Sequence, residues 1–173
     1  MLIKTIGIIC LILTGIIMGW SFVRDYEERI LNLKQFRKML ILLKGEMSYN
    51  NAGIRELLVC IARRNDNVIG DFLENVRTRF DFEDVTIQTA WSEATEEFLK
   101  EYTSLKESDR KYIKEFGMNL GTTDRDTQIN NILVCMEHIE LTIKELNDYK
   151  AQKCKMYKTL GVTVGAFLAI LLI

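Results

Sequence analysis

Apolar residues recur every three or four positions along most of the chain, which is the spacing that places them on one face of an α-helix. The 173 residues include no proline and only ten glycines, whereas a chain rich in strands needs frequent turns. We therefore predict an all-α fold, an antiparallel helical bundle. The clearest apolar face follows Arg24 and comprises Ile30, Leu33, Phe36, Leu40, Leu43 and Met47.

The same spacing predicts four shorter helices in the middle of the chain. Residues 80–89 have the β-branched content of a strand, but Ile87, Trp91, Ala94 and Phe98 lie at helical spacing, so we expect a loop followed by a helix. The four expected starts are Asn50 or Asn51, about Asp66, about Asp84, and Ser108 or Asp109.

A last, long helix is predicted after the string LGTTDRDTQI (Leu120–Ile129). Nothing interrupts its periodicity before a cluster of lysines near the C-terminus, so we expect it to continue into the apolar segment beyond them. Its inward stripe is expected to comprise Ile129, Ile132, Leu133, Met136, Ile139, Ile143 and Leu146.

The residues before this helix suit a tight corner. Gly117 and Gly121 can adopt the left-handed backbone that ends a helix. Thr122 or Thr123 can accept hydrogen bonds from the free N–H groups of the next helix. Thr123 followed by Asp126 approximates a capping box.

Two interpretations of the corner remain open. Asp124 lies where the helix dipole favours a negative charge, and Gln128 lies in the second turn, where a cap does not require an amide. The residues either only fix the corner or also form a docking surface for a partner. The candidate site comprises Gly121, Thr123, Asp124 and Gln128.

Both ends of the chain are apolar. Thr5–Val23 holds nineteen residues without a charge, about 28 Å of helix, which matches a bilayer core. A cleaved signal peptide is the alternative, but no A-x-A-like site follows. Thr159–Ile173 gives about 22 Å, or more with Met156 and Tyr157, and a buried core helix is its alternative. We predict three parts: a transmembrane helix 1–23, a helical domain 24–155 and a transmembrane helix 156–173.

Basic residues predict the orientation of these spans. Arg24 and Arg29 follow the first span, and Lys150, Lys153, Lys155 and Lys158 precede the second, with only Lys4 beyond the spans. The central domain is thus expected in the cytoplasm, with both termini outside, and the lysines can also contact anionic lipid. Each span contains a G-x-x-x-G pair that lets helices pack closely in lipid: Gly15 with Gly19, and Gly161 with Gly165.

No recognisable catalytic chemistry accompanies this architecture. The net charge of −1 argues against nucleic-acid binding. His138 is the only histidine, too few for a typical zinc site, and we find no P-loop and no G-x-S-x-G motif. We expect no enzyme activity, no cofactor and no metal. The four cysteines, expected to be buried reduced thiols, are Cys10, Cys60, Cys135 and Cys154.

The corner string resembles the stage III sporulation protein AB family. The family pattern, Leu-Gly-x-Ser/Thr-Asp with Gln four residues on, matches Leu120, Gly121, Thr123, Asp124 and Gln128. The resemblance extends over nearly the whole chain, through both terminal spans, the Trp91 helix and a Tyr-Lys-x-Leu-Gly pattern that begins at Tyr157. One departure is that SYNNAGIREL (Ser48–Leu57) lacks the proline common in the family.

The resemblance implies a membrane platform component of the complex that links mother cell and forespore in endospore-forming bacteria. The family's cytoplasmic part is similar to the helical domain of type II secretion F-proteins. Expected partners are a secretion-type ATPase on the mother-cell side, other membrane subunits of the complex, membrane lipid and further copies of this chain. A membrane-tethered helical adaptor or regulator unrelated to secretion is the alternative.

Overall fold

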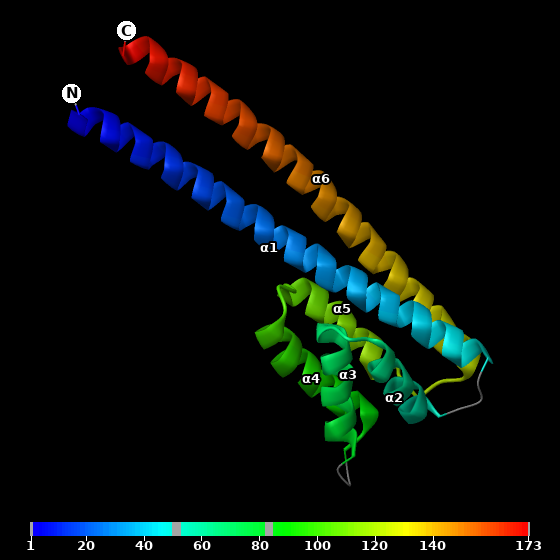
Figure 1. The fold of residues 1–173 in the computed structure, drawn as a ribbon. Helices are drawn as coiled ribbons and strands as arrows, with labels where there is room; N and C mark the ends of the chain where they lie inside the picture. The colour runs from blue at the N-terminus through cyan, green and yellow to red at the C-terminus, as the bar shows by residue number, and fades with distance from the viewer. Residues whose placement is uncertain (1, 50–52, 82–84, 173) are drawn as a thin grey trace. The chain divides into compact units, whose positions relative to one another are not determined.

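The computed structural model describes the backbone of residues 2–49, 53–81 and 85–172, and the side chains of residues 24–49, 53–81, 85–153 and 156. Within these residues it contains six α-helices and no strand, which confirms the predicted all-α class (Figure 1). The helices are α1 (Leu2–Tyr49), α2 (Ile54–Arg64), α3 (Val68–Phe80), α4 (Ile87–Tyr102), α5 (Glu107–Met118) and α6 (Arg125–Leu172).

The chain divides into two compact units, and α1 and α6 contribute to both. One unit comprises Met1–Glu27 and Lys144–Ile173, and the other, called the central unit below, comprises Glu28–Ile143. Among the residues whose side chains are described, no helix is both long and apolar enough to span a bilayer. The predicted spans Thr5–Val23 and Thr159–Ile173 lie outside that part of the chain.

The core of the central unit is built around the indole of Trp91 on α4. Its Nε1 donates a hydrogen bond to the carbonyl of Ile113, at 2.8 Å. Its ring lies edge-on to Phe36, Phe72 and Phe116, with centroid distances of 6.3, 5.0 and 5.6 Å. This geometry is favourable for aromatic pairs, so one side chain joins α1, α3, α4 and α5 in a single cluster.

The buried faces of the two long helices follow the predicted periodicity, with one exception. All six apolar residues predicted on α1 are buried, together with Met39. On α6, Ile132, Ile139 and Leu146 are buried, and Ile129, Met136 and Ile143 are half-buried. The prediction for Leu133 is wrong, because 41% of that residue is exposed. The inward stripe of α6 is therefore narrower than the sequence pattern indicated.

The starts of α2 and α3 differ from those predicted. The N-cap of α2 is Gly53, which has no side chain to form a capping bond, and the expected caps Asn50 and Asn51 lie outside the described residues. The N-cap of α3 is Asn67, one residue after the predicted Asp66. Its Oδ1 accepts hydrogen bonds from the two N–H groups at positions 69 and 70, at 3.0 and 3.3 Å, which fixes the start of α3.

The starts of α4 and α5 also differ. Helix α4 begins at Ile87 rather than near Asp84, because Thr86 is extended and its hydroxyl accepts the N–H of Thr89, at 3.2 Å. In α5 neither Ser108 nor Asp109 is the N-cap. Asp109 lies in the first turn, where its carboxylate accepts the N–H of Lys106, at 2.9 Å.

Candidate functional site

The predicted corner joins α5 to α6 through residues 119–124. Leu120 anchors it, since its side chain is buried and its carbonyl accepts a hydrogen bond from Nε2 of Gln88 on α4. Gly121 follows with a φ of +74°, which is the left-handed backbone predicted for it. A side chain at this position would be strained by that φ rather than by lack of space, because a Cβ would meet only ordinary contacts.

Gly117 does not have the predicted role, because it lies inside α5. A Cβ at this position would lie 1.9 Å from Cδ1 of Trp91, far inside van der Waals contact. Glycine is needed here so that the backbone of α5 can approach the indole. The structure thus separates two glycines that the sequence treats alike: Gly117 supports the core and Gly121 makes the turn.

Asp124, rather than Thr123, caps α6. Its Oδ2 accepts the N–H of Thr127 at 3.0 Å, and its Oδ1 accepts the Thr127 hydroxyl at 2.8 Å. These two bonds, the backbone N–H first, hold the pKa of the Asp124 carboxyl below its usual value. The prediction that a threonine caps this helix, with Thr123 and Asp126 as a capping box, is therefore wrong, and Thr122 instead donates its hydroxyl to the carbonyl of Asn119, at 3.1 Å.

Gln128 closes the corner from the second turn of α6. Its Nε2 donates a hydrogen bond to the carbonyl of Thr123, at 2.7 Å, so the amide has a structural role that the capping pattern alone does not require. Its Oε1 is shielded from solvent and has no hydrogen-bond partner. A buried acceptor without a partner is uncommon and costs free energy.

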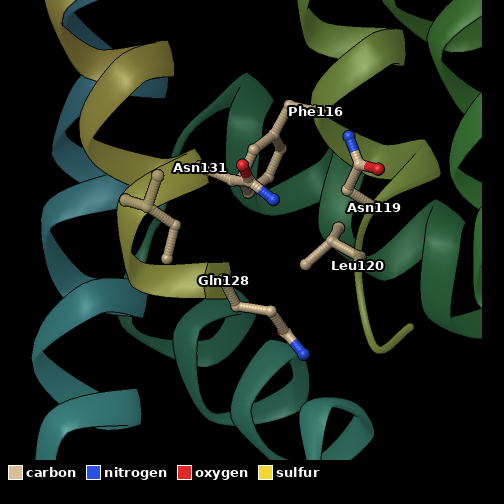
Figure 2. Close-up of a pocket in the computed structure, with 6 residues that line it drawn as sticks. Phe116, Asn119, Leu120, Gln128 and Asn131 are labelled. Atoms are coloured by element: carbon tan, nitrogen blue, oxygen red, sulfur yellow. The ribbon is translucent and has the colours of Figure 1, made fainter. Parts of the chain in front are cut away.

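Gln128 also lines a small surface pocket, together with residues of α5, the corner and α6 (Figure 2). The pocket is shallow, because the space of about 190 Å³ that it borders includes open solvent, and it has no enclosed room for a water molecule. Its apolar lining is Phe116, Leu120 and Ile132, and three carboxamides complete it: Asn119, Gln128 and Asn131. The pocket thus offers a shallow apolar surface bordered by hydrogen-bond donors and acceptors, which suits contact with the surface of a protein partner.

The sequence analysis did not identify Asn119 or Asn131 as site residues. Only Asn131 has a sequence feature that could have indicated it. Asn131 lies three residues after Gln128, so the two amides share one face of α6. Asn119 donates its side-chain amide to the carbonyl of Glu115, at 3.3 Å, whereas the side chain of Asn131 makes no hydrogen bond to another described residue. The corner therefore presents more polar groups than the fold itself uses.

The other predicted sites are described only in part. Lys150 pairs with Glu27, and the ammonium of Lys153 lies 5.1 Å from the ring centroid of Tyr149, which itself lies 5.3 Å from the ring centroid of Tyr26. These contacts within one unit pair α1 with α6. The remaining predicted residues lie outside the described side chains: Gly15, Gly19, Lys155, Lys158, Gly161 and Gly165.

The described residues supply no alternative chemical centre. No group of three metal-ligating side chains occurs among them. His138 is half-buried and lies against Tyr112, with ring centroids 3.4 Å apart. Acidic side chains that could suggest a metal site serve as links between helices instead: Glu96 pairs with Lys114 at 2.9 Å, and Glu97 with Arg79 at 2.6 Å.

Comparison with known proteins identifies the family. The family model for stage III sporulation protein AB matches residues 4–173. The stage III sporulation protein AB of Bacillus subtilis (strain 168) is 25% identical over 171 residues, which is 99% of both chains. A solved structure of stage III sporulation protein AB (SpoIIIAB) covers 72% of this chain and 98% of its own, with a TM-score of 0.65 and 23% identity, which shows the same fold. The resemblance carried by the corner motif and the terminal segments is thus confirmed, and the chain belongs to the stage III sporulation protein AB family.

Proposed function

We propose that this chain is a non-enzymatic platform of a sporulation complex, which holds a secretion-type ATPase against the membrane. The names of the family and of the Bacillus subtilis relative support a sporulation role. In this proposal the terminal helices span the membrane, and the central unit faces the mother-cell cytoplasm. The chain binds its partners without turnover.

The observation that carries the proposal is the pocket at the corner before α6. It combines an apolar floor with the orphan Oε1 of Gln128 and the unused amide of Asn131. A donor from another protein could satisfy Oε1 of Gln128, which is favourable because a buried polar atom without a partner is costly. The half-buried amide of Asn131 could add a further hydrogen bond at the edge of the contact. Hot spots of protein interfaces lie where apolar contacts become fully desolvated on binding, and the apolar floor of this pocket would allow such a contact.

The two long helices support a role in mechanical coupling. Each of α1 and α6 has 48 residues without a break, about 72 Å of continuous helix at 1.5 Å per residue. Each leads from a terminal apolar segment into the central unit, and neither contains a proline. A force or displacement applied at the corner would be transmitted along unbroken helices rather than absorbed by a loop.

Binding of the ATPase by a variant of the pocket tests this function. Asn131→Lys places a longer, charged side chain at the edge of the pocket, and Asn131 takes part in none of the hydrogen bonds that hold the corner. Asn130→Lys is the matched control, since Asn130 is exposed on α6 and is not part of the pocket. We expect the full-length chain in detergent to bind the ATPase, and Asn131→Lys to weaken binding by about tenfold or more, as loss of a hot spot does.

Circular dichroism and the melting temperature should be the same for both variants. Asp124→Ala and Gln128→Ala are less informative, because each also removes a hydrogen bond that holds the corner. Equal binding by Asn131→Lys and Asn130→Lys would refute the pocket as the docking site. No binding by the wild-type chain would refute the ATPase as the partner and favour an adaptor unrelated to secretion.

A further inference from the structure

Helix α1 carries an exposed stripe of two aliphatic and two lysine side chains. Leu31, Lys34, Lys38 and Ile41 lie three or four residues apart, on the side of α1 opposite its buried face. Leu31 is 53% exposed and Ile41 is 46% exposed. Neither lysine has an ion-pair partner among the described residues, so the stripe presents two uncompensated positive charges between two apolar side chains.

Helix α6 carries a second stripe of the opposite charge. Leu133, Val134, Glu137 and Leu141 are all exposed, at 41% and 67% for the first two and 54% for Leu141. No described residue pairs with Glu137. Five large apolar residues in the two stripes are therefore open to solvent on the central unit, and their burial against a partner would be favourable.

Both stripes lie on the same side of the central unit. One flank of α1 packs on the shorter helices, as the contact between Phe36 and Trp91 shows, and α6 packs on α5 through His138 and Tyr112. The adjacent flanks of α1 and α6 face each other, where Arg37 pairs with Glu140 at 2.9 Å. The side of each helix that no neighbour covers is the one that faces away from α2–α5, and the two stripes lie on this side.

We propose that a second copy of this chain covers these stripes, in a twofold dimer whose axis runs parallel to α1 and α6. The α1–α6 pairs of two copies can stack face to face in two ways, with the twofold axis either perpendicular or parallel to the helices. An axis across them would set Lys34 and Lys38 against the same lysines of the other copy. An axis along them sets each α1 stripe against the α6 stripe of the other copy, so that charges of opposite sign meet.

The register within one chain supports this arrangement. Because Arg37 and Glu140 are paired and the two helices run in opposite directions, Lys38 lies at about the height of residue 139. Glu137 is two residues away from that height, about 3 Å along the helix, within reach of a lysine side chain. A twofold axis along the helices preserves height, so Lys38 of each copy meets Glu137 of the other in an antiparallel four-helix arrangement.

Charge exchange in the full-length chain tests the dimer, independently of the ATPase. Sedimentation equilibrium in density-matched detergent measures the dissociation constant of the wild type, Lys38→Glu, Glu137→Lys and the combined variant. We expect a wild-type dimer, weakening by about tenfold or more in each single variant, and recovery in the combined variant. Lys100→Glu and Glu101→Lys, both exposed on α4, are the matched controls and should change nothing.

Three results would overturn the proposal. The first is a wild-type chain that stays monomeric across the concentration range. The second is a combined variant that associates as weakly as either single variant, since the two charges would then not face each other. The third is a Lys38→Glu chain that dimerises normally but loses binding to vesicles of anionic lipid, which would make the α1 stripe a lipid contact.

Discussion

The guanidinium of Arg29 on α1 donates two hydrogen bonds to the carboxylate of Asp109 on α5, at 2.7 and 2.8 Å. Both residues are buried, with 9% and 6% of their surface exposed. The same carboxylate accepts the N–H of Lys106, so it both starts α5 and ties that helix to α1. Bidentate pairing is the strongest geometry available to these two side chains.

Removal of Arg29 should be strongly destabilising. Arg29→Ala leaves the Asp109 carboxylate buried without its partner, which costs about 3–5 kcal/mol of unfolding free energy. Arg37→Ala is the control, because its pair with Glu140 is partly exposed and such pairs contribute at most about 1 kcal/mol. Chemical denaturation of the full-length chain, monitored by far-ultraviolet circular dichroism, gives the free energy of unfolding of both variants. Equal losses of this free energy would contradict a dominant role for the buried pair.

Two glycine-to-alanine changes should have opposite signs. Gly117→Ala drives a methyl group into the indole of Trp91, and overpacking of this kind costs about 1–3 kcal/mol. Gly45→Ala places its methyl group in open space on α1 and should stabilise the helix by about 0.5–1 kcal/mol. Melting temperatures of the two variants provide the measurement. If Gly117→Ala were neutral, the tight approach of α5 to Trp91 would be wrong.

The cap of α6 should make stability depend on pH. The Thr127 N–H and hydroxyl hold the pKa of Asp124 below its usual value, so the cap contributes stability above the unfolded pKa, about 3.9. That contribution is lost as the pH falls from about 4 through the lowered folded pKa. The melting temperature of Asp124→Ala should therefore lie below that of the wild type at pH 7, and the gap should narrow below pH 4. A constant gap would show that the carboxylate charge is not what caps the helix.

Cysteine reactivity should distinguish two thiols. Burial raises the pKa of Cys135 to about 12, so at pH 8 only about one molecule in ten thousand carries the reactive thiolate. Cys60 on α2 is only half-buried. Mass spectrometry after brief treatment of the folded chain with iodoacetamide should find Cys60 modified and Cys135 intact. Equal modification would mean that the face of α6 that carries Cys135 opens to solvent.

The periodic pattern predicted the helices well, because burial of one face is what the pattern records. All six positions predicted on α1 are buried. The pattern failed where a helix has neighbours on only part of its circumference, as at Leu133, which is apolar but exposed. It also gave the start of α4 three residues early, since extended backbone at Thr86 delays the helix.

Contacts between residues far apart in the chain could not be predicted. Arg29 and Asp109 are 80 positions apart, and the sequence suggested only a topology signal for one and a cap for the other. Gly117 was grouped with Gly121 because nothing local shows that Trp91 lies against it. The left-handed backbone of Gly121 was predicted correctly, because it depends only on the local sequence. Asp124 and Gln128 were placed at the corner, but the cap was assigned to a threonine and the bond from Gln128 to Thr123 was not foreseen.

Liposome flotation of the full-length chain with the secretion-type ATPase tests the central claim most directly. The account predicts that the chain floats with the lipid and that the ATPase floats only when the chain is present. With Asn131→Lys the chain should still float while most of the ATPase stays at the bottom, and Asn130→Lys should behave as the wild type. A chain that remains at the bottom, or an ATPase that floats equally with Asn131→Lys, would contradict the account.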